Sequence, residues 1–195
     1  MKVVFASRNR HKAEQVSLIL PGMDLVLLDE IAPDLVLDEP FETFEANALA
    51  KARAVVEATG LPALADDSGL EVDALNGGPG VQSARFAGDE ATDEENNRKL
   101  VEKLAGVPED KLSCNYRCIA VLVTSEGHEL LASGRCEGRV VLEGRGDLGF
   151  GYDPHFVPEG DTRTMGEIPI DEKLEFNHRG RAFRALAEMM REIGD

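Results

Sequence analysis

Short apolar runs alternate along the chain with longer stretches in which apolar residues recur at helical spacing. Residues 2–6 and 23–28 are β-branched or apolar runs, which predict buried strands. Between them, the apolar spacing predicts a helix over residues 12–20. The acidic segment 33–40, which begins and ends in proline, predicts an irregular loop. This order of elements is typical of a mixed α/β protein.

Two further helices carry capping signals at their start. Thr43 can cap a helix over residues 44–59, and Gly60 can end it. Thr92 and Glu95 have the spacing of a capping box ahead of another helix. The sequence itself therefore indicates where these helices begin.

The second half of the chain predicts strands followed by a C-terminal helix. Residues 113–141 are rich in Val, Cys, Ile and Leu, and the turn-like EGHE within them predicts two or three antiparallel strands. Apolar spacing predicts a last helix over residues 179–193. No repeat, low-complexity tract or long linker interrupts the chain, so we expect residues 1–195 to form one domain.

Composition limits the classes of partner that this protein can bind. With 21 basic and 37 acidic residues the formal net charge is −16, which argues against a nucleic-acid or anionic-membrane surface. No apolar run approaches the roughly 18 residues of a membrane span, so we expect a cytoplasmic protein. The 3 cysteines include no CxxC pair and predict neither a disulfide framework nor a zinc site. An anionic ligand would therefore need a local basic pocket.

The segment SRNRHK, residues 7–12, joins the first strand to the first helix. Such a turn can offer backbone N–H groups, a helix-dipole end and Lys12 to a phosphate. A solvated basic helix start is the alternative. Basic residues are unfavourable beside the positive end of a helix unless an anion is near, so a ligand is favoured.

A pair of carboxylates, Asp66 and Asp67, follows a short strand predicted over residues 63–65. Neighbouring side chains of a strand point to opposite faces, so both reach one cavity only if the strand ends between or just after them. Ser68 and Gly69 favour such an end. Paired carboxylates suit a Mg²⁺ ion, or a metal ligand beside a general base, whereas turn-capping aspartates are the alternative.

Other segments add groups that could hold a metal triphosphate and its base. Glu39 stands in the acidic loop, and Asn47 and Lys51 share one face of a predicted helix. GFGYDP, residues 149–154, sets aromatic rings that can stack on a nucleobase between glycines, although a plain turn is the alternative. Asn177 can cap the last helix, and the donors around it are Lys173, His178 and Arg179.

The order of these motifs is that of a known family. SxNxxK, NAxxKA, ADDSGLxVDALxGxPGxxSAR, GFGYDPxF and a Lys followed by His-Arg together resemble the inosine triphosphate pyrophosphatases, the Ham1 or RdgB-like enzymes. The resemblance runs from Lys2 to about Ala187. It implies an elongated, two-lobed α/β fold with a mixed sheet, an active site in the cleft between the lobes, and a homodimer. It also implies Mg²⁺-dependent hydrolysis of ITP, dITP or XTP to the monophosphate and pyrophosphate.

The resemblance further implies roles for individual residues. Asp67 would be the general base, and Glu39 and Asp67 would bind the metal. The residues that would bind the substrate are Ser7, Arg8, Asn9, Arg10, His11, Lys12, Lys51, Ser68, Phe150, Gly151, Tyr152, Asp153, Lys173, His178 and Arg179.

Three positions depart from the family pattern. Ala46 stands where a glutamate usually precedes the Asn-Ala pair, with Glu45 one place earlier, which weakens a metal role for Glu45. Asn177 replaces the usual serine before His-Arg, and asparagine caps a helix equally well. The first loop is also more basic than usual, because it contains Arg8, Arg10 and His11.

Two other functions fit part of the pattern. A Maf-like pyrophosphatase for other nucleotides has a similar start, ASxSPRR, but would leave GFGYDP and the His-Arg pair unexplained. A non-catalytic nucleotide sensor could use the same pocket, but it would not need a base, Asp67, beside a metal ligand. We therefore expect a pyrophosphatase for purine nucleotides, with a 6-oxo group meeting donors such as Lys173.

Overall fold

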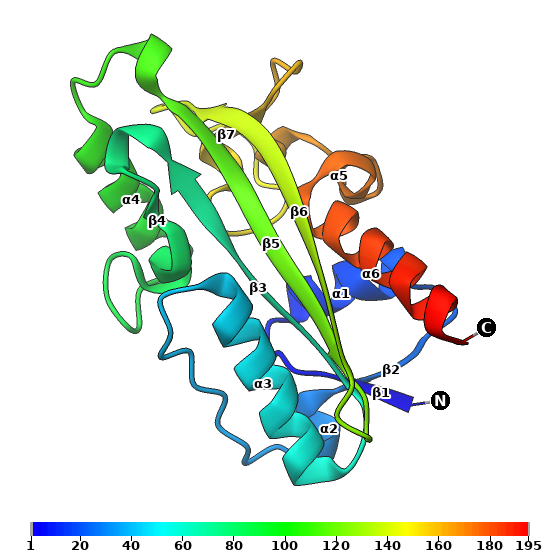
Figure 1. The fold of residues 1–195 in the computed structure, drawn as a ribbon. Coiled ribbons are helices and arrows are strands. Elements are labelled where there is room, and N and C mark those ends of the chain that lie inside the picture. The colour runs from blue at the N-terminus through cyan, green and yellow to red at the C-terminus, as the bar shows by residue number, and fades with distance from the viewer. Residues whose placement is uncertain (1, 195) are drawn as a thin grey trace. The chain divides into compact units, whose positions relative to one another are not determined.

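The computed structural model describes residues 2–194 as a mixed sheet with helices (Figure 1). The strands are β1 (Lys2–Phe5), β2 (Asp24–Leu27), β3 (Ala63–Val72), β4 (Gly78–Pro79), β5 (Ser113–Val123), β6 (Glu129–Val140) and β7 (Phe156–Pro158). The α-helices are α1 (Arg10–Ile19), α2 (Leu28–Ile31), α3 (Phe44–Thr59), α4 (Asp93–Leu104), α5 (Ile170–Phe176) and α6 (His178–Gly194).

The sheet contains both parallel and antiparallel pairs. Its hydrogen-bonded order is β2-β1-β3-β5-β6-β7, with β4 paired to β3 off this path. β1 lies parallel to both β2 and β3, whereas β4 is antiparallel to β3 and β7 is antiparallel to β6. The predicted mixed α/β class is therefore confirmed.

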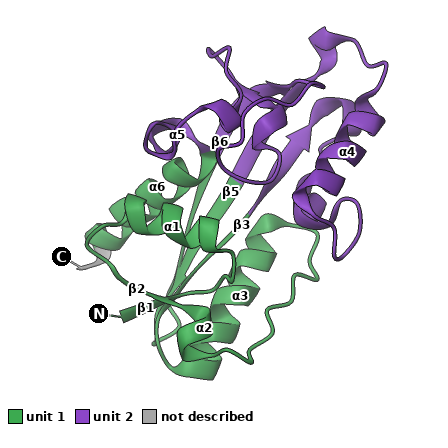
Figure 2. Ribbon diagram, turned by 180° about the vertical axis from the view of Figure 1, so that it is seen from behind, with its two compact units in different colours: residues 1–67, 118–134, 178–195 green, residues 68–117, 135–177 purple. Residues whose placement is uncertain are grey.

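The chain divides into two compact units, and each contains segments from distant parts of the sequence (Figure 2). Unit 1 comprises residues 1–67, 118–134 and 178–195. Unit 2 comprises residues 68–117 and 135–177. The chain passes between the units within β3, β5 and β6 and again between α5 and α6, so no long linker separates them in the sequence.

Unit 1 has helices on both faces of its strands. Alternate residues of β1, Val3 and Phe5, pack with Val16 of α1 and Phe183 of α6 in one buried cluster. α1 and α6 lie side by side over this face. α3 covers the other face, and its buried stripe includes Ala48, Ala52 and Val55. This alternation follows from the period of two along each strand.

Unit 2 has its own apolar core. Leu70 of β3, Leu100 of α4 and Tyr116 of β5 belong to one buried cluster. Tyr116 also stacks on Phe156, with ring centroids 4.6 Å apart. The predicted capping box of α4 is present, because the Thr92 hydroxyl accepts from the Glu95 amide and the Glu95 carboxylate accepts from the Thr92 amide.

The strand expected over residues 63–65 is much longer than the sequence indicated. β3 continues through Asp66, Asp67, Ser68 and Gly69 to Val72, so the expectation that it stops at the aspartates is wrong. The reason for a glycine here is spatial. A Cβ on Gly69 would collide with the main-chain oxygen of Gly80 and with Oγ of Ser83, so this glycine allows close packing instead of forming a turn.

The other boundaries differ by smaller amounts. α1 begins at Arg10, two residues earlier than expected, because Asn9 caps it. The segment 113–141 forms β5 and β6, which the turn after Val123 joins. Four elements, α2, α5, β4 and β7, were not expected from the sequence. Within residues 2–194, no helix combines the length and apolar character that crossing a bilayer requires.

Candidate active site

Asp66 and Asp67 point to opposite faces of β3, because the strand continues through both of them. The partners of Asp66 come from α1, α6 and β5, on the face that α1 and α6 cover. Asp67 has its partners on α3, on the other face. The two carboxylates therefore have different hydrogen-bond partners, although the charges of Lys12 and Lys51 each act on both of them.

Asp66 is the centre of a buried charge network. Its Oδ2 accepts hydrogen bonds from Nε and Nη2 of Arg179 at 3.1 and 3.0 Å, and Nζ of Lys12 lies 3.3 Å from its Oδ1. Nη1 of Arg179 donates to Gln15 at 2.9 Å. Burial disfavours ionisation of Asp66, but the charges of Lys12 and Arg179 outweigh it and hold its pKa well below the usual value.

Asp67 lies beside Lys51 and Glu39 in a different network. Nζ of Lys51 is 2.5 Å from Oε1 of Glu39 and 3.9 Å from Oδ1 of Asp67. The same ammonium donates to the main-chain oxygen of Asp66 at 2.8 Å. Nδ2 of Asn47 donates to Oδ2 of Asp67 at 3.1 Å. An acidic loop, a helix and a strand therefore bring two carboxylates to one ammonium group.

The ionisation of Asp67 differs from that of its neighbour. Burial raises its pKa to about 6, and the negative charge of Glu39 acts in the same direction. The positive charges of Lys51 and Lys12 and the hydrogen bond from Asn47 oppose this rise without cancelling it. A carboxylate with a pKa near neutrality is suited to accept a proton from a water molecule.

The donor set around Lys51 matches the chemistry of a hard divalent cation. Mg²⁺ is commonly held by one or two carboxylates, and waters and substrate phosphates supply its other ligands. Glu39 and Asp67 are two such carboxylates, drawn toward the same positive group. Among residues 2–194, no cluster of three or more His, Cys, Asp or Glu side chains is arranged as a metal site.

The first loop lies at the start of α1, as the sequence predicted. Oδ1 of Asn9 accepts from the Lys12 amide, and the Asn9 amide donates to Oγ of Ser7, each at 3.2 Å. Arg10 and His11 are exposed in the first turn. Arg8 contacts the acidic loop, since its guanidinium donates to the main-chain oxygens of residues 33 and 35. Its phosphate contact stays a prediction.

At the start of α6, His178 and Arg179 are both buried. Burial lowers the pKa of His178 well below the usual value, so the imidazole is neutral at pH 7. Arg179 donates to Asp66 and Gln15 as described above. The sequence analysis missed Gln15. The sequence pattern that could have identified Gln15 is its position on the buried face of α1, three residues after Lys12, where a polar residue is unusual.

In unit 2, Lys173 is held inside the GFGYDP region. Its Nζ lies 2.9 Å from Oδ2 of Asp153 and donates to the main-chain oxygen of Leu148 at 3.3 Å. Lys173 is only 2% exposed. Gly149, at φ +92°, leaves room for this ion pair, because a Cβ there would overlap Asp153 and Lys173. The aromatic Phe150 of the same loop is half-buried.

The rest of this loop is anchored to neighbouring segments of unit 2. The Tyr152 hydroxyl donates to the main-chain oxygen of Ser83 at 2.7 Å. The Gly151 amide donates to Oδ2 of Asp93 at 2.7 Å, and the Gly151 oxygen accepts from Nδ2 of Asn97 at 2.9 Å. Sequence reasoning did not identify Asp93 and Asn97. Their only signal was a spacing of four on one helix, which many exposed polar residues share.

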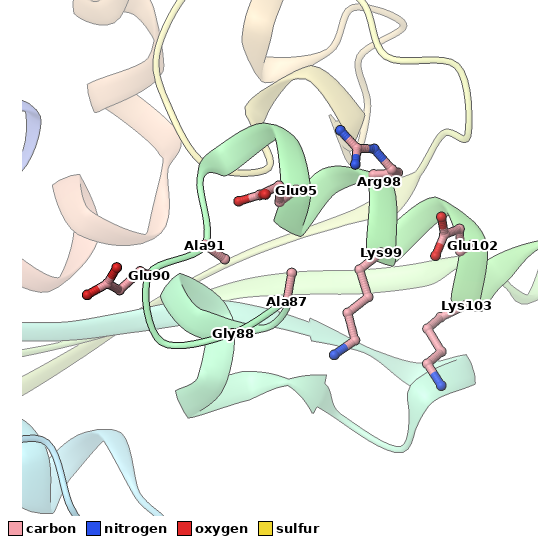
Figure 3. Close-up of a pocket in the computed structure, with 9 residues that line it drawn as sticks. All are labelled: Ala87, Gly88, Glu90, Ala91, Glu95, Arg98, Lys99, Glu102 and Lys103. Carbon is pink, nitrogen blue, oxygen red and sulfur yellow. The ribbon is translucent and has the colours of Figure 1, made fainter.

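A surface pocket of about 540 Å³ lies along α4, as Figure 3 shows. Charged side chains of both signs line it, among them Glu95, Arg98 and Lys103. Lys99 is engaged with Phe86, since its ammonium donates to the Phe86 oxygen and lies 4.8 Å from the ring centroid. None of the residues that line this pocket is a predicted site residue.

The chain is similar to known proteins over nearly its full length. The chain is 44% identical over 189 residues to a dITP/XTP pyrophosphatase of Geobacter sulfurreducens, covering 96% of this chain and 95% of that one. It is 45% identical to a dITP/XTP pyrophosphatase of Frankia alni, covering 99% and 98% of the two chains.

Solved structures are similar over nearly the full length. The Ham1 protein of Staphylococcus aureus has a TM-score of 0.89 at 33% identity, covering 98% of this chain and 99% of that one. A HAM1 protein of Coxiella burnetii has a TM-score of 0.88 at 37% identity, with the same coverage. The model of the Ham1 family matches residues 3–189. The chain therefore belongs to the Ham1 family.

Proposed function

We propose that this protein hydrolyses ITP, dITP and XTP to the nucleoside monophosphate and pyrophosphate, and so removes non-standard purines from the nucleotide pool. The observation that carries the proposal is the meeting of Glu39, Asp67 and Lys51 within unit 1. Two carboxylates with a buried ammonium suit a metal-bound triphosphate. The relatives from Geobacter sulfurreducens and Frankia alni are named dITP/XTP pyrophosphatases, which supports dITP and XTP as substrates.

In this mechanism Asp67 accepts a proton from the water that attacks the α-phosphorus. In the absence of a metal its pKa is about 6, so the carboxylate is mostly ionised at pH 7 and available as a base. Glu39 and Asp67 would hold Mg²⁺, whose chemistry here is to neutralise charge that develops on the phosphates. Lys12, at the start of α1, and Lys51 contribute positive charge toward the phosphates.

The purine would be recognised by the loop that contains Phe150 and by Lys173. The Lys173 ammonium has three N–H groups, and Asp153 and the Leu148 oxygen accept from two of them. The third can donate to the 6-oxo group of hypoxanthine or xanthine. Adenine presents an amino group there and would leave the donor unpaired, which can support discrimination of about 10⁴. His178 and Arg179 stay predicted contacts of the base.

A nucleotide panel tests the proposal directly. Purified protein is incubated with ITP, dITP, XTP, ATP, GTP, dTTP and UTP, with and without Mg²⁺, and pyrophosphate is resolved from phosphate. We expect Mg²⁺-dependent release of pyrophosphate from ITP, dITP and XTP. Preference for dTTP or UTP would instead indicate a Maf-like enzyme, and binding without turnover would indicate a sensor.

The two-lobed shape, the homodimer and the cytoplasmic location stay predictions.

A further inference from the structure

The side-chain amide of Asn47 joins two acidic segments of unit 1. Its Oδ1 accepts from the Phe41 amide at 2.9 Å, and its Nδ2 donates to the Phe41 oxygen at 3.1 Å. The same Nδ2 donates to Oδ2 of Asp67 at 3.1 Å. Asn47 has no exposed surface. One buried side chain therefore holds both Asp67 and the main chain two residues beyond Glu39.

These contacts fix the orientation of the amide. If the Asn47 amide were rotated by half a turn, its oxygen would face the Phe41 oxygen and the Asp67 carboxylate, and its nitrogen would face the Phe41 amide. An aspartate at this position would create the same two repulsions. The site therefore requires one donor group and one acceptor group in a side chain of this length.

At its start, the loop before α3 is held by the hydrogen bonds that Arg8 donates to the main-chain oxygens of residues 33 and 35. Residues 32–43 contain no helix or strand, and Val36 and Phe41 are 72% and 47% exposed. Near its end, the anchors that connect this loop to α3 include the ion pair of Glu39 with Lys51 and the Asn47 hydrogen bonds to Phe41. A cation at the Glu39 carboxylate would compete with the Lys51 ammonium. It would not disturb the neutral hydrogen bonds of Asn47 to the main chain.

We infer that Asn47 is a positioning residue that sets the separation of the Glu39 and Asp67 carboxylates and so controls how tightly the protein binds its divalent cation. The inference rests on the proposed function, which assigns the cation to these carboxylates. Mg²⁺ requires both oxygens at about 2.1 Å, so the carboxylates must lie within about 4 Å of each other. Asn47 holds the segments of both.

The chain contains a matched control for the structural part of this role. Asn96 of α4 is also buried, at 2% exposure, and clamps a loop in the same way. Its Oδ1 accepts from the Ala87 amide at 2.8 Å, and its Nδ2 donates to the Ala84 oxygen at 3.1 Å. Losing either asparagine removes two buried hydrogen bonds to a loop, but only Asn47 also contacts Asp67.

The test compares Asn47→Ala and Asn47→Ser with Asn96→Ala and Asn96→Ser. Melting temperature, the Mg²⁺ concentration for half-maximal ITP turnover, and kcat are measured for each variant. We expect similar losses of melting temperature at both positions. Only the Asn47 variants should show a half-saturating Mg²⁺ concentration about tenfold or more above wild type, together with a lower kcat. The serine variants, which keep a small polar side chain without adding a charge, keep the comparison available if an alanine variant does not fold.

A second readout does not depend on turnover. Hydrogen exchange of residues 39–43 is followed in wild type and Asn47→Ala, with and without Mg²⁺. Added Mg²⁺ should slow exchange in wild type and have a much smaller effect in the variant. If wild type hydrolysed none of the nucleotides, the proposed function would fail, and this exchange experiment would still decide the role of Asn47. The inference would be overturned if the Asn47 variants had the half-saturating Mg²⁺ concentration and the kcat of wild type. It would also be overturned if Mg²⁺ slowed hydrogen exchange in Asn47→Ala as much as it does in wild type.

Discussion

Asp66 and Arg179 form a fully buried ion pair, in which Nε and Nη2 of Arg179 lie 3.1 and 3.0 Å from Oδ2 of Asp66. The side chains are 0% and 2% exposed. The pair connects β3 to the first turn of α6, and Lys12 connects the same carboxylate to α1. Asp66, for which the sequence indicated no definite role, therefore orders the two helices on its face of β3.

Replacing this carboxylate should destabilise the protein strongly. Asp66→Asn leaves the buried guanidinium of Arg179 without its countercharge, so we expect a loss of about 3–5 kcal/mol in the free energy of unfolding. Because the pKa of Asp66 is lowered by folding, its contribution is present above its unfolded pKa and is lost as pH falls below that value. The variant should therefore show weaker acid dependence in urea unfolding.

An exposed ion pair of the same unit provides the control. Nε of Arg53 donates to Oε1 of Glu129 at 2.6 Å, but the side chains are 58% and 34% exposed. Glu129→Gln should change the free energy of unfolding by less than about 1 kcal/mol. If Asp66→Asn also changed the free energy of unfolding by less than about 1 kcal/mol, the buried network would not have the structural importance that we assign to it.

Replacing Asp67 should have the opposite effect on stability. Folding raises its pKa to about 6, so its protonated form is the one that the folded state favours. Its contribution is therefore full below an unfolded pKa of about 4 and is lost as pH rises through about 6. Asp67→Asn removes this charge and should raise the free energy of unfolding by about 1–3 kcal/mol at pH 8 without divalent cations, while abolishing turnover.

Urea unfolding at pH 4 and pH 8 checks this expectation. The gain from Asp67→Asn should shrink at pH 4, where wild-type Asp67 is itself largely protonated. Turnover of ITP by the variant at the wild-type rate would contradict the role of Asp67 as base. A stability gain that did not change with pH would mean that the gain does not arise from the ionisation of Asp67.

Two glycines of the GFGYDP loop should respond differently to the same substitution. Gly149→Ala places a Cβ against Asp153 and Lys173, in addition to the strain of φ +92°. We expect it to raise the KM for ITP at least about tenfold, because the Asp153 carboxylate and the Lys173 ammonium must both be displaced to admit the Cβ. Gly151→Ala, at φ +62°, meets nothing within 4 Å and should cost only about 1–2 kcal/mol of stability. Steady-state kinetics gives the KM for ITP of both variants, and thermal unfolding gives their stability. Equal increases of KM in Gly149→Ala and Gly151→Ala would contradict the expectation.

Lys173 should affect binding of the purine but not of the phosphates. Lys173→Met removes the ammonium and leaves the carboxylate of Asp153 unneutralised, so we expect weaker inhibition by IMP. Inhibition by pyrophosphate should be unchanged. Exposed Lys111→Met is the control for loss of a positive charge. If Lys173→Met weakened inhibition by IMP and by pyrophosphate to the same extent, this lysine would not act on the base alone.

Local signals in the sequence were sufficient where neighbouring residues set the structure. Thr43 caps α3, Thr92 and Glu95 form the capping box of α4, and the strand at residues 2–5 is where its apolar run predicted. These features depend on hydrogen bonds within one turn or on the period of one strand. The motif order also identified the family, because it depends on residue types along the chain and not on their positions in space.

The candidate site was predicted as a set of residues but not as an arrangement. The sequence indicated Glu39, Asp67 and Lys51, and the structure brings these three together within unit 1. It did not indicate that Asn47 would hold Phe41 and Asp67, because a side-chain amide can serve a ligand or a main chain equally well.

The sequence by itself determined most of the longer strands and helices, the caps of α3 and α4 and the presence of two adjacent carboxylates in DDSG. Only the tertiary structure decided what these carboxylates do. Ser-Gly in this position resembles a turn, but Gly69 is required because Gly80 and Ser83 approach β3 too closely for a Cβ. The strand therefore continues, and its period of two sends Asp66 toward Arg179 and Asp67 toward Lys51. Contacts between residues far apart in the chain, which no local pattern encodes, separate the two aspartates into a structural group and a catalytic candidate.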